Sequence, residues 1–504
     1  MLFTGDGFTG GAPALRVRAV NRRDVNPHAA FVLYWMIAAR RVSSNFALDR
    51  AAAWARELRL PLVVLEALRV DYPFASDRLH RFVIDGMADN ARALAGGNVR
   101  YFPYVEPAPG SGSGLLARLA LDAAVVVTDD FPCFFLPAAV EAAGRRVSVR
   151  LEAVDSNGLL PLAAVPQAYP AAVHHRRFLQ KVLREHLAAV PSLSPRFDDL
   201  KDASGAICGD ILLGWPEASP ELLHGNRSAL AALPIDHGVG TTEARGGSAA
   251  GQRTLERFVA DRLASYHLTQ SHPDDQGTSR LSPYLHFGHV SAHQVFRAVM
   301  TSERWNLGRL GVKANGLRQG WWGVAPGPEA FLDQLVVWRE LAFSTCAKRP
   351  TEYGSFDGLP AWARATLEAH QSDTRPYVYE RQSFEDARTH DPLWNAAQRE
   401  LLRDGWMHNY MRMLWGKKIL EWSRSPREAF DTMAAIMDRW ALDGRDPNSY
   451  AGYAWTLGRY DRPWPERAIY GTVRSMTSGS AARKLRLREY LTRNAAPGLD
   501  FDTD

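Results

Sequence analysis

Apolar and polar positions change their spacing repeatedly along the first 160 residues. Short apolar runs rich in β-branched and aromatic residues, such as AFVLYWM from Ala30 and LPLVVLEAL from Leu60, alternate with segments of helical spacing, such as residues 44–58 and 76–94. Continuous apolar strands that alternate with helices are typical of a parallel sheet covered on both faces. The pattern predicts an α/β domain over residues 1–160, built on a doubly wound parallel sheet.

The pattern weakens between residues 161 and 250, where Pro, Gly and Ser interrupt helical fragments and a glycine-rich stretch begins at Pro234. We interpret 161–250 as an interdomain linker. Strand-like alternation is scarce from residue 251 onward, so residues 251–504 are predicted to form an all-helical domain. The first helix of this domain is expected to place five apolar side chains on one face: Leu255, Phe258, Val259, Leu263 and Tyr266.

Composition narrows the class of protein. A chain of 504 residues is too long for one core, and its net charge of +5 permits binding to a polyanion without requiring it. Cys133, Cys208 and Cys346 lie far apart, so we expect neither a disulfide framework nor a zinc or iron–sulfur site, and no metal. The N-terminus lacks the apolar run of a signal peptide, and no stretch approaches ~20 apolar residues. We therefore expect a cytoplasmic protein without a membrane-spanning segment.

The predicted sheet lacks the two commonest phosphate-binding signatures. No G-x-G-x-x-G follows the first strand, and no G-x-x-x-x-G-K-[ST] occurs anywhere in the chain. Asp129 and Asp130 end one predicted strand, at the edge where such sheets place ligands. They are either ligand-binding residues or ordinary polar residues at the end of a strand.

Three segments of the helical half carry candidate chemistry. In TSRLSPYLHFGHVS, the hydroxyls of Thr278, Ser279 and Ser282 precede a predicted helix start at Pro283. Hydroxyls and free N–H groups at a helix N-terminus form either an anion site or a simple N-cap.

The second segment, WNAAQRELLRDGWMHNYMRMLWGKKILEW, contains two helices separated at Asp404-Gly405. Trp415 and Trp422 are seven residues apart on the second helix, which places them on one face, roughly 10 Å apart along the axis. Trp394 lies on the preceding helix, where it can approach Trp415. These indoles form either a relay for electron hopping or an aromatic stripe of the core.

The third segment, LDGRDPNSYAGYAWTLGRYDRPWPER (442–467), is so dense in acids, Arg, Pro, Gly and Asn that it predicts a long structured loop. Buried carboxylates in such a loop need cationic partners, and Arg412 is a candidate partner for Asp443.

These segments resemble the signature segments of the photolyase/cryptochrome family. TSRLSPYLHFG, GWMHNYMRM and PWPERAIYG are similar to the family as a whole, whereas THDPLWNAAQ, KKILEW and LDGRDPN resemble class II cyclobutane pyrimidine dimer photolyases in particular. The match runs in order from about residue 16 to residue 484. It implies light-dependent repair of ultraviolet lesions in DNA, carried out by a monomer that contains FAD. A second, antenna chromophore (a deazaflavin, a folate or a flavin) can accompany the FAD in this family, and no residue set decides which.

The resemblance also implies roles for individual residues. Tyr266 is expected near the adenine, and Thr278, Ser279, Leu281 and Ser282 at the diphosphate. The residues expected around the flavin are Gln398, Asn409, Arg412, Asp443 and Asp446. The expected lesion pocket contains Trp338, Trp455 and Met413, and the expected electron relay consists of Trp422, Trp415 and Trp394.

Two positions depart from the class II pattern. Gln334 stands where the family has its catalytic Glu, four residues before Trp338; its amide can donate a hydrogen bond to the lesion but cannot give up a proton. Met437 stands where an Asn approaches the flavin, and Asn448 is a candidate replacement for it. Both changes favour an alternative function, a cryptochrome-like blue-light receptor without repair, whereas Trp338, Trp455 and Met413 favour repair. A (6-4) lesion also stays open as the substrate, since His408 lies on the pocket helix.

Overall fold

The structure is a computed structural model that describes residues 10–496, and it divides into two compact units. The first contains the chain up to Pro166, Val182–Glu256 and Leu281–Met300; the second contains Gln167–Lys181, Arg257–Arg280 and the chain from Thr301 onward. The chain therefore passes between the units several times. The assignment of residues 1–160 to an α/β domain, 161–250 to a linker and 251–504 to a helical domain stays a prediction. The expectation about the N-terminus concerns in part residues 1–9, outside the described range.

The first unit is built on a six-stranded sheet with the order β1-β6-β5-β2-β3-β4. All neighbouring strands are parallel except β1 and β6, which are antiparallel. The parallel sheet is confirmed, and the edge strand β1 is an addition that its three residues were too few to reveal. The strands are β1 (Val17–Ala19), β2 (Phe31–Met36), β3 (Leu62–Leu68), β4 (Val99–Val105), β5 (Ala123–Asp129) and β6 (Leu151–Val154).

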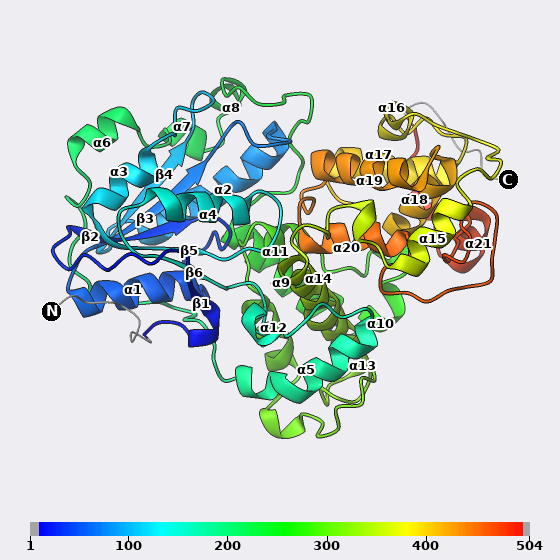
Figure 1. The fold of residues 1–504 in the computed structure, drawn as a ribbon, viewed down its shortest axis with the longest axis horizontal. Helices are drawn as coiled ribbons and strands as arrows, with labels where there is room; N and C mark the ends of the chain where they lie inside the picture. The colour runs from blue at the N-terminus through cyan, green and yellow to red at the C-terminus, as the bar shows by residue number, and fades with distance from the viewer. Residues whose placement is uncertain (1–9, 497–504) are drawn as a thin grey trace. The chain divides into compact units, whose positions relative to one another are not determined.

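Helices cover both faces of this sheet, as a doubly wound fold requires (Figure 1). Successive strand residues point to opposite faces. Val32 and Val64 therefore pack with α1 (Phe46–Leu58), whereas Leu33 and Val63 pack with α3 (Leu115–Asp122) and α4 (Leu136–Arg146). The other helices wholly within this unit are α2 (Asp77–Leu94), α6 (Gly209–Gly214), α7 (Pro220–Leu223), α8 (Arg227–Ala231) and α11 (Ser282–His286).

Asp129, at the carboxyl end of β5, stabilises the first unit through hydrogen bonds to neighbouring backbone. Its Oδ2 accepts backbone N–H groups from Ile37, Ala38 and Ala39 at 2.8, 2.7 and 3.0 Å, and its Oδ1 accepts the Tyr34 hydroxyl at 2.8 Å. These contacts satisfy buried backbone donors just beyond β2. Of the two interpretations of Asp129, the structure thus supports the polar residue that stabilises a strand end.

The second unit is helical (Figure 1). Its helices are α10 (Tyr266–Thr269), α13 (Pro326–Leu332), the π-helical turn η5 (Asp333–Trp338), α14 (Arg339–Lys348), α15 (Ala361–Ala369), α16 (Arg381–Glu385), α17 (Pro392–Asp404), α18 (Asn409–Trp422), α19 (Pro426–Trp440), α20 (Pro447–Thr456), α21 (Ser478–Lys484) and α22 (Arg488–Arg493). Three helices continue from one unit into the other: α5 (Ala172–His186), α9 (Ser248–Asp261) and α12 (Ala292–Ser302). Within residues 10–496, no helix combines the length and apolar character that crossing a membrane requires.

Two local expectations for this half are wrong. The predicted helix through Tyr266 ends at Asp261, and Tyr266 begins the separate helix α10. Tyr266 still packs edge-on against Phe258, with 5.8 Å between ring centroids, because the turn returns it to the same apolar cluster. The predicted loop over 442–467 contains helix α20. Asp446 is the N-cap of this helix, and Pro447 occupies its first helical position.

Candidate functional site

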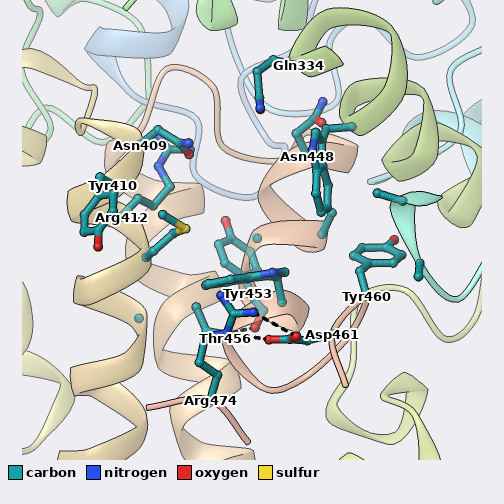
Figure 2. A pocket seen from close by; sticks show the side chains of 18 of the residues that line it. Gln334, Asn409, Tyr410, Arg412, Asn448, Tyr453, Thr456, Tyr460, Asp461 and Arg474 are labelled. Carbon is teal, nitrogen blue, oxygen red and sulfur yellow. Dashed lines mark hydrogen bonds and ion pairs between the residues drawn. The ribbon is translucent and has the colours of Figure 1, made fainter. Parts of the chain in front are cut away.

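The second unit contains a pocket of about 690 Å³, which we call the central pocket (Figure 2). Its wall brings together eight of the residues singled out from the sequence: Gln334, Trp338, Asn409, Arg412, Met413, Trp415, Asn448 and Trp455. Three structural elements supply them, namely η5, α18 and α20. A mixed wall of aromatic, apolar and a few polar side chains is typical of a site for an organic ligand.

Gln334 and Trp338 reach the pocket from the π-helical turn η5. A π-helical turn holds one more residue than an α-helical turn, and such turns are frequent at functional sites. Asp333 is buried beside Gln334 and pairs with Arg176, its carboxylate accepting the Nε–H at 2.8 Å. The carboxylate next to Gln334 in the sequence is therefore engaged in an ion pair with Arg176.

Helix α18 presents Asn409, Arg412 and Met413 to the central pocket. The preceding helix α17 ends at Gly405, which adopts the left-handed conformation (φ 64°) that favours glycine at a helix C-terminus. The side chain of His408 caps α18 by accepting the N–H of Tyr410. In Figure 2, Asn409 and Arg412 project from this helix on one side of the pocket, with Asn448 across from them.

Arg412 and Asp443 form an ion pair beside the pocket. The Arg412 Nη2 atom lies 3.0 and 3.3 Å from the two carboxylate oxygens, with the side chains 19% and 8% exposed. The Asp443 backbone carbonyl also accepts the hydroxyl of Ser449, on the first turn of α20. The pair between helix α18 and the 442–446 segment suggested by the sequence is therefore present, and it balances the charge of a partly buried guanidinium.

Two basic side chains lie close to the indole of Trp455. Lys417 Nζ is 5.1 Å from a Trp455 ring centroid, and the Arg474 guanidinium is 5.8 Å away. Arg474 pairs with Asp461 at 3.0 Å, a contact drawn at the lower end of the pocket in Figure 2. Lys417 donates to the carbonyl of Thr456 at 2.5 Å, and burial lowers the pKa of this lysine to about 7.

Three of the four tryptophans of the second segment, Trp394, Trp415 and Trp422, form one continuous cluster that begins in the pocket wall at Trp415. Trp394 is stacked on Trp415 at 6.3 Å between ring centroids and meets Trp422 edge-on at 6.0 Å. The Nε1–H of Trp394 donates to the Trp415 carbonyl at 3.0 Å, and that of Trp415 donates to Gln398 Oε1 at 2.8 Å. Trp394 therefore bridges the other two indoles, which lie on one helix. The spacing suits both an electron relay and a packed aromatic core.

Several predicted cofactor residues are buried outside the wall of the central pocket. Gln398 and Met437 are fully buried, and Asp446 caps α20 by accepting the N–H of Asn448. Tyr266 is buried against Phe331, and burial raises the pKa of its hydroxyl. Leu281 and Ser282 belong to the first compact unit, whereas Thr278 and Ser279 belong to the second.

Some buried polar atoms of the second unit have no hydrogen-bond partner in the described structure, among them Thr278 Oγ1, His408 Nε2 and Arg412 Nε. Unsatisfied buried donors and acceptors are costly and call for an explanation. Thr278 and Arg412 are residues predicted to contact the diphosphate and the flavin. Their atoms fit a polar, anionic cofactor, to which a hydroxyl and a guanidinium N–H can both donate.

Several residues of the pocket wall were not predicted from the sequence. Asp461 and Arg474 form its ion pair, Tyr453 and Tyr460 add phenol rings, and Arg176 adds a buried guanidinium. Asp461 lies within the third segment, where its acid-rich composition could have marked it. No comparable signal marks Arg176, which lies in the stretch interpreted as a linker.

The fold is that of the photolyase and cryptochrome class. A bacterial class III photolyase from Agrobacterium tumefaciens superimposes with a TM-score of 0.66 at 17% identity, covering 92% of this chain and 86% of its own. The cryptochrome of Synechocystis sp. PCC6803 superimposes with a TM-score of 0.64 at 14% identity, covering 92% and 88%. At these identities the likeness concerns the fold, and it confirms the expected architecture.

Sequence relatives identify the family. A deoxyribodipyrimidine photo-lyase of Methanothermobacter thermautotrophicus is 33% identical over 482 residues, which cover 95% of this chain and 98% of the relative. Proteins of the same name from Oryza sativa subsp. japonica and Potorous tridactylus are 32% and 31% identical, covering 95% and 92% of this chain and 90% and 80% of their own. No family model matches the chain.

The chain belongs to the deoxyribodipyrimidine photo-lyase family, which confirms the enzyme class expected from the sequence. The assignment to class II within that family stays a prediction.

Proposed function

We propose that this protein repairs cyclobutane pyrimidine dimers in DNA by light-driven electron transfer from reduced FAD held within residues 251–504. One observation carries the proposal: Trp338, Met413 and Trp455 line the same pocket as Trp415, the first indole of a tryptophan cluster. The names of the relatives support the choice of a pyrimidine dimer as the substrate.

The central pocket suits a flipped-out dinucleotide. Trp338 and Trp455 offer π faces, and stacking of a base on an aromatic side chain contributes about 1–3 kcal/mol. Extrusion of the lesion from the duplex is easier than that of a normal base pair because its pairing and stacking are already impaired. The Gln334 amide can donate to a pyrimidine carbonyl, and Arg474 at the pocket wall can approach a phosphate.

The residues that would hold the cofactor carry hydrogen-bond donors suited to an anionic group. Thr278 would donate its hydroxyl to the diphosphate, and Arg412, with Asn409, would lie at the flavin. When bound, the flavin supplies the light-driven electron for repair. A positive charge at Arg412 favours an anionic group beside it, and Asp443 keeps that charge balanced when no anion is bound. The antenna chromophore stays unassigned among deazaflavin, folate and flavin.

The tryptophan cluster would supply electrons to this site from outside. Trp415 lies in the pocket wall, Trp394 contacts it at 6.3 Å, and Trp422 follows at 6.0 Å. These short steps suit both interpretations, and the resemblance to the family's electron-transfer tryptophans favours the relay over a purely structural aromatic stripe.

A second candidate is a blue-light receptor without repair. Gln334 favours it, because the amide in the pocket wall holds no acidic proton for the lesion. Met437 also favours it, since a fully buried thioether replaces a hydrogen-bonding side chain.

Repair of a defined substrate distinguishes the two candidates. The purified protein, reconstituted with FAD and chemically reduced, is illuminated with an oligonucleotide that carries one thymine dimer, and the restored thymines are quantified against a dark control. We expect light-dependent repair, and a faster rate in the Gln334→Glu variant. Stable flavin reduction without repair in both proteins rejects the enzyme and supports the receptor.

A further inference from the structure

The outermost indole of the tryptophan cluster is enclosed by protein. Trp422 is only 1% exposed, so a reductant in solution has little access to its ring. An electron hole that arrives there by way of Trp394 therefore needs another oxidisable group between Trp422 and solvent. In the described part of the chain, the other rings in contact with Trp422 are Tyr379, Phe384 and His390.

We propose that Tyr379 is the terminal electron donor of this relay and that His390 is its proton acceptor. In this step Tyr379 gives one electron to the oxidised Trp422, the phenol O–H bond breaks, and the proton passes to His390 Nδ1. The products are a neutral indole, a neutral tyrosyl radical and an imidazolium. A thiolate in solution then gives one electron to the tyrosyl radical and becomes a thiyl radical, while the imidazolium proton returns to the phenol oxygen. The proposal rests on the electron relay proposed above.

Tyr379 is held against Trp422 by backbone as well as by ring packing. Its N–H donates to the Trp422 carbonyl at 3.0 Å, and the two rings meet edge-on at 5.8 Å between centroids. This separation is shorter than the 6.0 and 6.3 Å steps among the tryptophans. Phe384 also contacts Trp422, but a phenyl ring is far harder to oxidise than a phenol, so Tyr379 is the better donor.

The hydrogen bonds of the Tyr379 hydroxyl suit loss of its proton. The oxygen lies 2.8 Å from His390 Nδ1 and accepts the backbone N–H of His390 at 3.0 Å. Because the backbone N–H is a donor, the phenol hydrogen is left for Nδ1, in the imidazole tautomer that carries its own hydrogen on Nε2. The distance is within the range for direct proton transfer. The backbone N–H also stabilises the oxygen once its proton has gone.

A surface ring completes the path. Tyr377 stacks on His390 at 3.6 Å between ring centroids and is nearly parallel to Tyr379, with 4° between planes at 6.4 Å. Tyr377 is 47% exposed, and His390 is also exposed. A small reductant can therefore reach the edge of this stack, although it cannot reach Trp422. The alternative to an electron path is a purely structural role, in which the aromatic stack only anchors residues 377–390 to the end of α18.

Radical spectroscopy on the holoprotein tests the proposal. Protein loaded with oxidised FAD is illuminated without an added reductant, and radicals are followed by transient absorption and electron paramagnetic resonance. We expect a tryptophan radical that decays into a tyrosyl radical, with a slower second step in D₂O. Tyr379→Phe should abolish the tyrosyl signal, and His390→Phe should slow its formation and remove the solvent isotope effect.

Tyr169→Phe is the matched control, because Tyr169 also lies beside a histidine, with 5.5 Å between its ring and that of His175, but outside the tryptophan cluster. It should leave both radical signals unchanged. Circular dichroism and flavin content verify that each variant is folded. A tryptophan radical without any tyrosyl radical in the wild type, or a tyrosyl signal that survives Tyr379→Phe, overturns the proposal alone. Absence of the tryptophan radical from the wild type overturns the relay as well.

Discussion

The indole rings of Trp394 and Trp415 lie nearly parallel, with 7° between their planes and 6.3 Å between their centroids. They come from different helices, α17 and α18, and the Nε1–H of Trp394 donates to the backbone carbonyl of Trp415. This contact connects the pocket wall to the remaining aromatic cluster. Trp394 is therefore the position at which the proposed relay is most easily interrupted.

Replacement of Trp394 by Phe should abolish light-driven reduction of bound FAD, because a phenyl ring is too difficult to oxidise to relay the hole. The loss of one buried hydrogen bond should lower the free energy of unfolding by about 1 kcal/mol. Flavin absorbance during illumination with a thiol measures the first effect, and urea unfolding measures the second. Trp54→Phe is the control, since Trp54 is buried and donates to Glu152 in the first unit. Photoreduction at the wild-type rate in Trp394→Phe contradicts the relay.

Replacement of Asp443 by Asn should destabilise the protein by about 1–3 kcal/mol, between the values for exposed and fully buried ion pairs. The reason is that Arg412, only 19% exposed, loses the charge that balances it. Urea unfolding of the protein without cofactor measures the change. Asp357→Asn removes the partner of Arg427 from an exposed pair and should destabilise the protein less than Asp443→Asn does. Equal losses in the free energy of unfolding for the two variants would show that burial of the Arg412–Asp443 pair does not affect stability.

Lys417 should make stability depend on pH. Its pKa falls from 10.5 to about 7 on folding because burial disfavours the charged amine. Between these two values the unfolded chain binds more protons than the folded chain, so the contribution of Lys417 to stability rises with pH across this window.

The variant Lys417→Met removes this contribution. Its free energy of unfolding, relative to that of the wild type, should therefore be highest below about pH 7 and should fall toward about pH 10. Unfolding by urea at a series of pH values measures the difference. Lys181→Met, at an exposed position on α5, is the control for the loss of a lysine as such. A flat profile for Lys417→Met would mean that the buried amine keeps its charge.

Replacement of Asp446 by Ala should lower the free energy of unfolding by about 1 kcal/mol, since α20 loses the side chain that accepts the N–H of Asn448. Asp446→Asn keeps a capping oxygen and should recover most of that loss. Because α20 carries Trp455 into the central pocket, the Asp446→Ala variant should also bind a dimer-containing oligonucleotide more weakly. Fluorescence anisotropy measures the affinity. Identical affinities for the Asp446→Ala and Asp446→Asn variants would show that loss of the helix cap does not affect binding in the pocket.

The hydrophobic pattern determined the sheet and most of its helices. The apolar runs from Ala30, Leu60 and Ala123 became β2, β3 and β5, because strands buried on both faces must be apolar throughout. The Asp404-Gly405 break was equally visible, since glycine readily adopts the left-handed conformation that ends α17. Ordered motifs likewise determined the family, as the relatives confirm.

Tertiary structure alone decided how these pieces meet. Helix α20 was mistaken for a loop because its cap at Asp446 and Pro447 lies within a polar composition that propensity disfavours. The pairing of Arg474 with Asp461 joins positions on either side of an irregular segment, and the contact between Trp422 and Tyr379 joins positions in different elements; no helical or strand period encodes such contacts. The local hydrophobic pattern follows from the short-range geometry of strands and helices. The pocket and the aromatic cluster beside it follow from packing between elements that are separate in the chain.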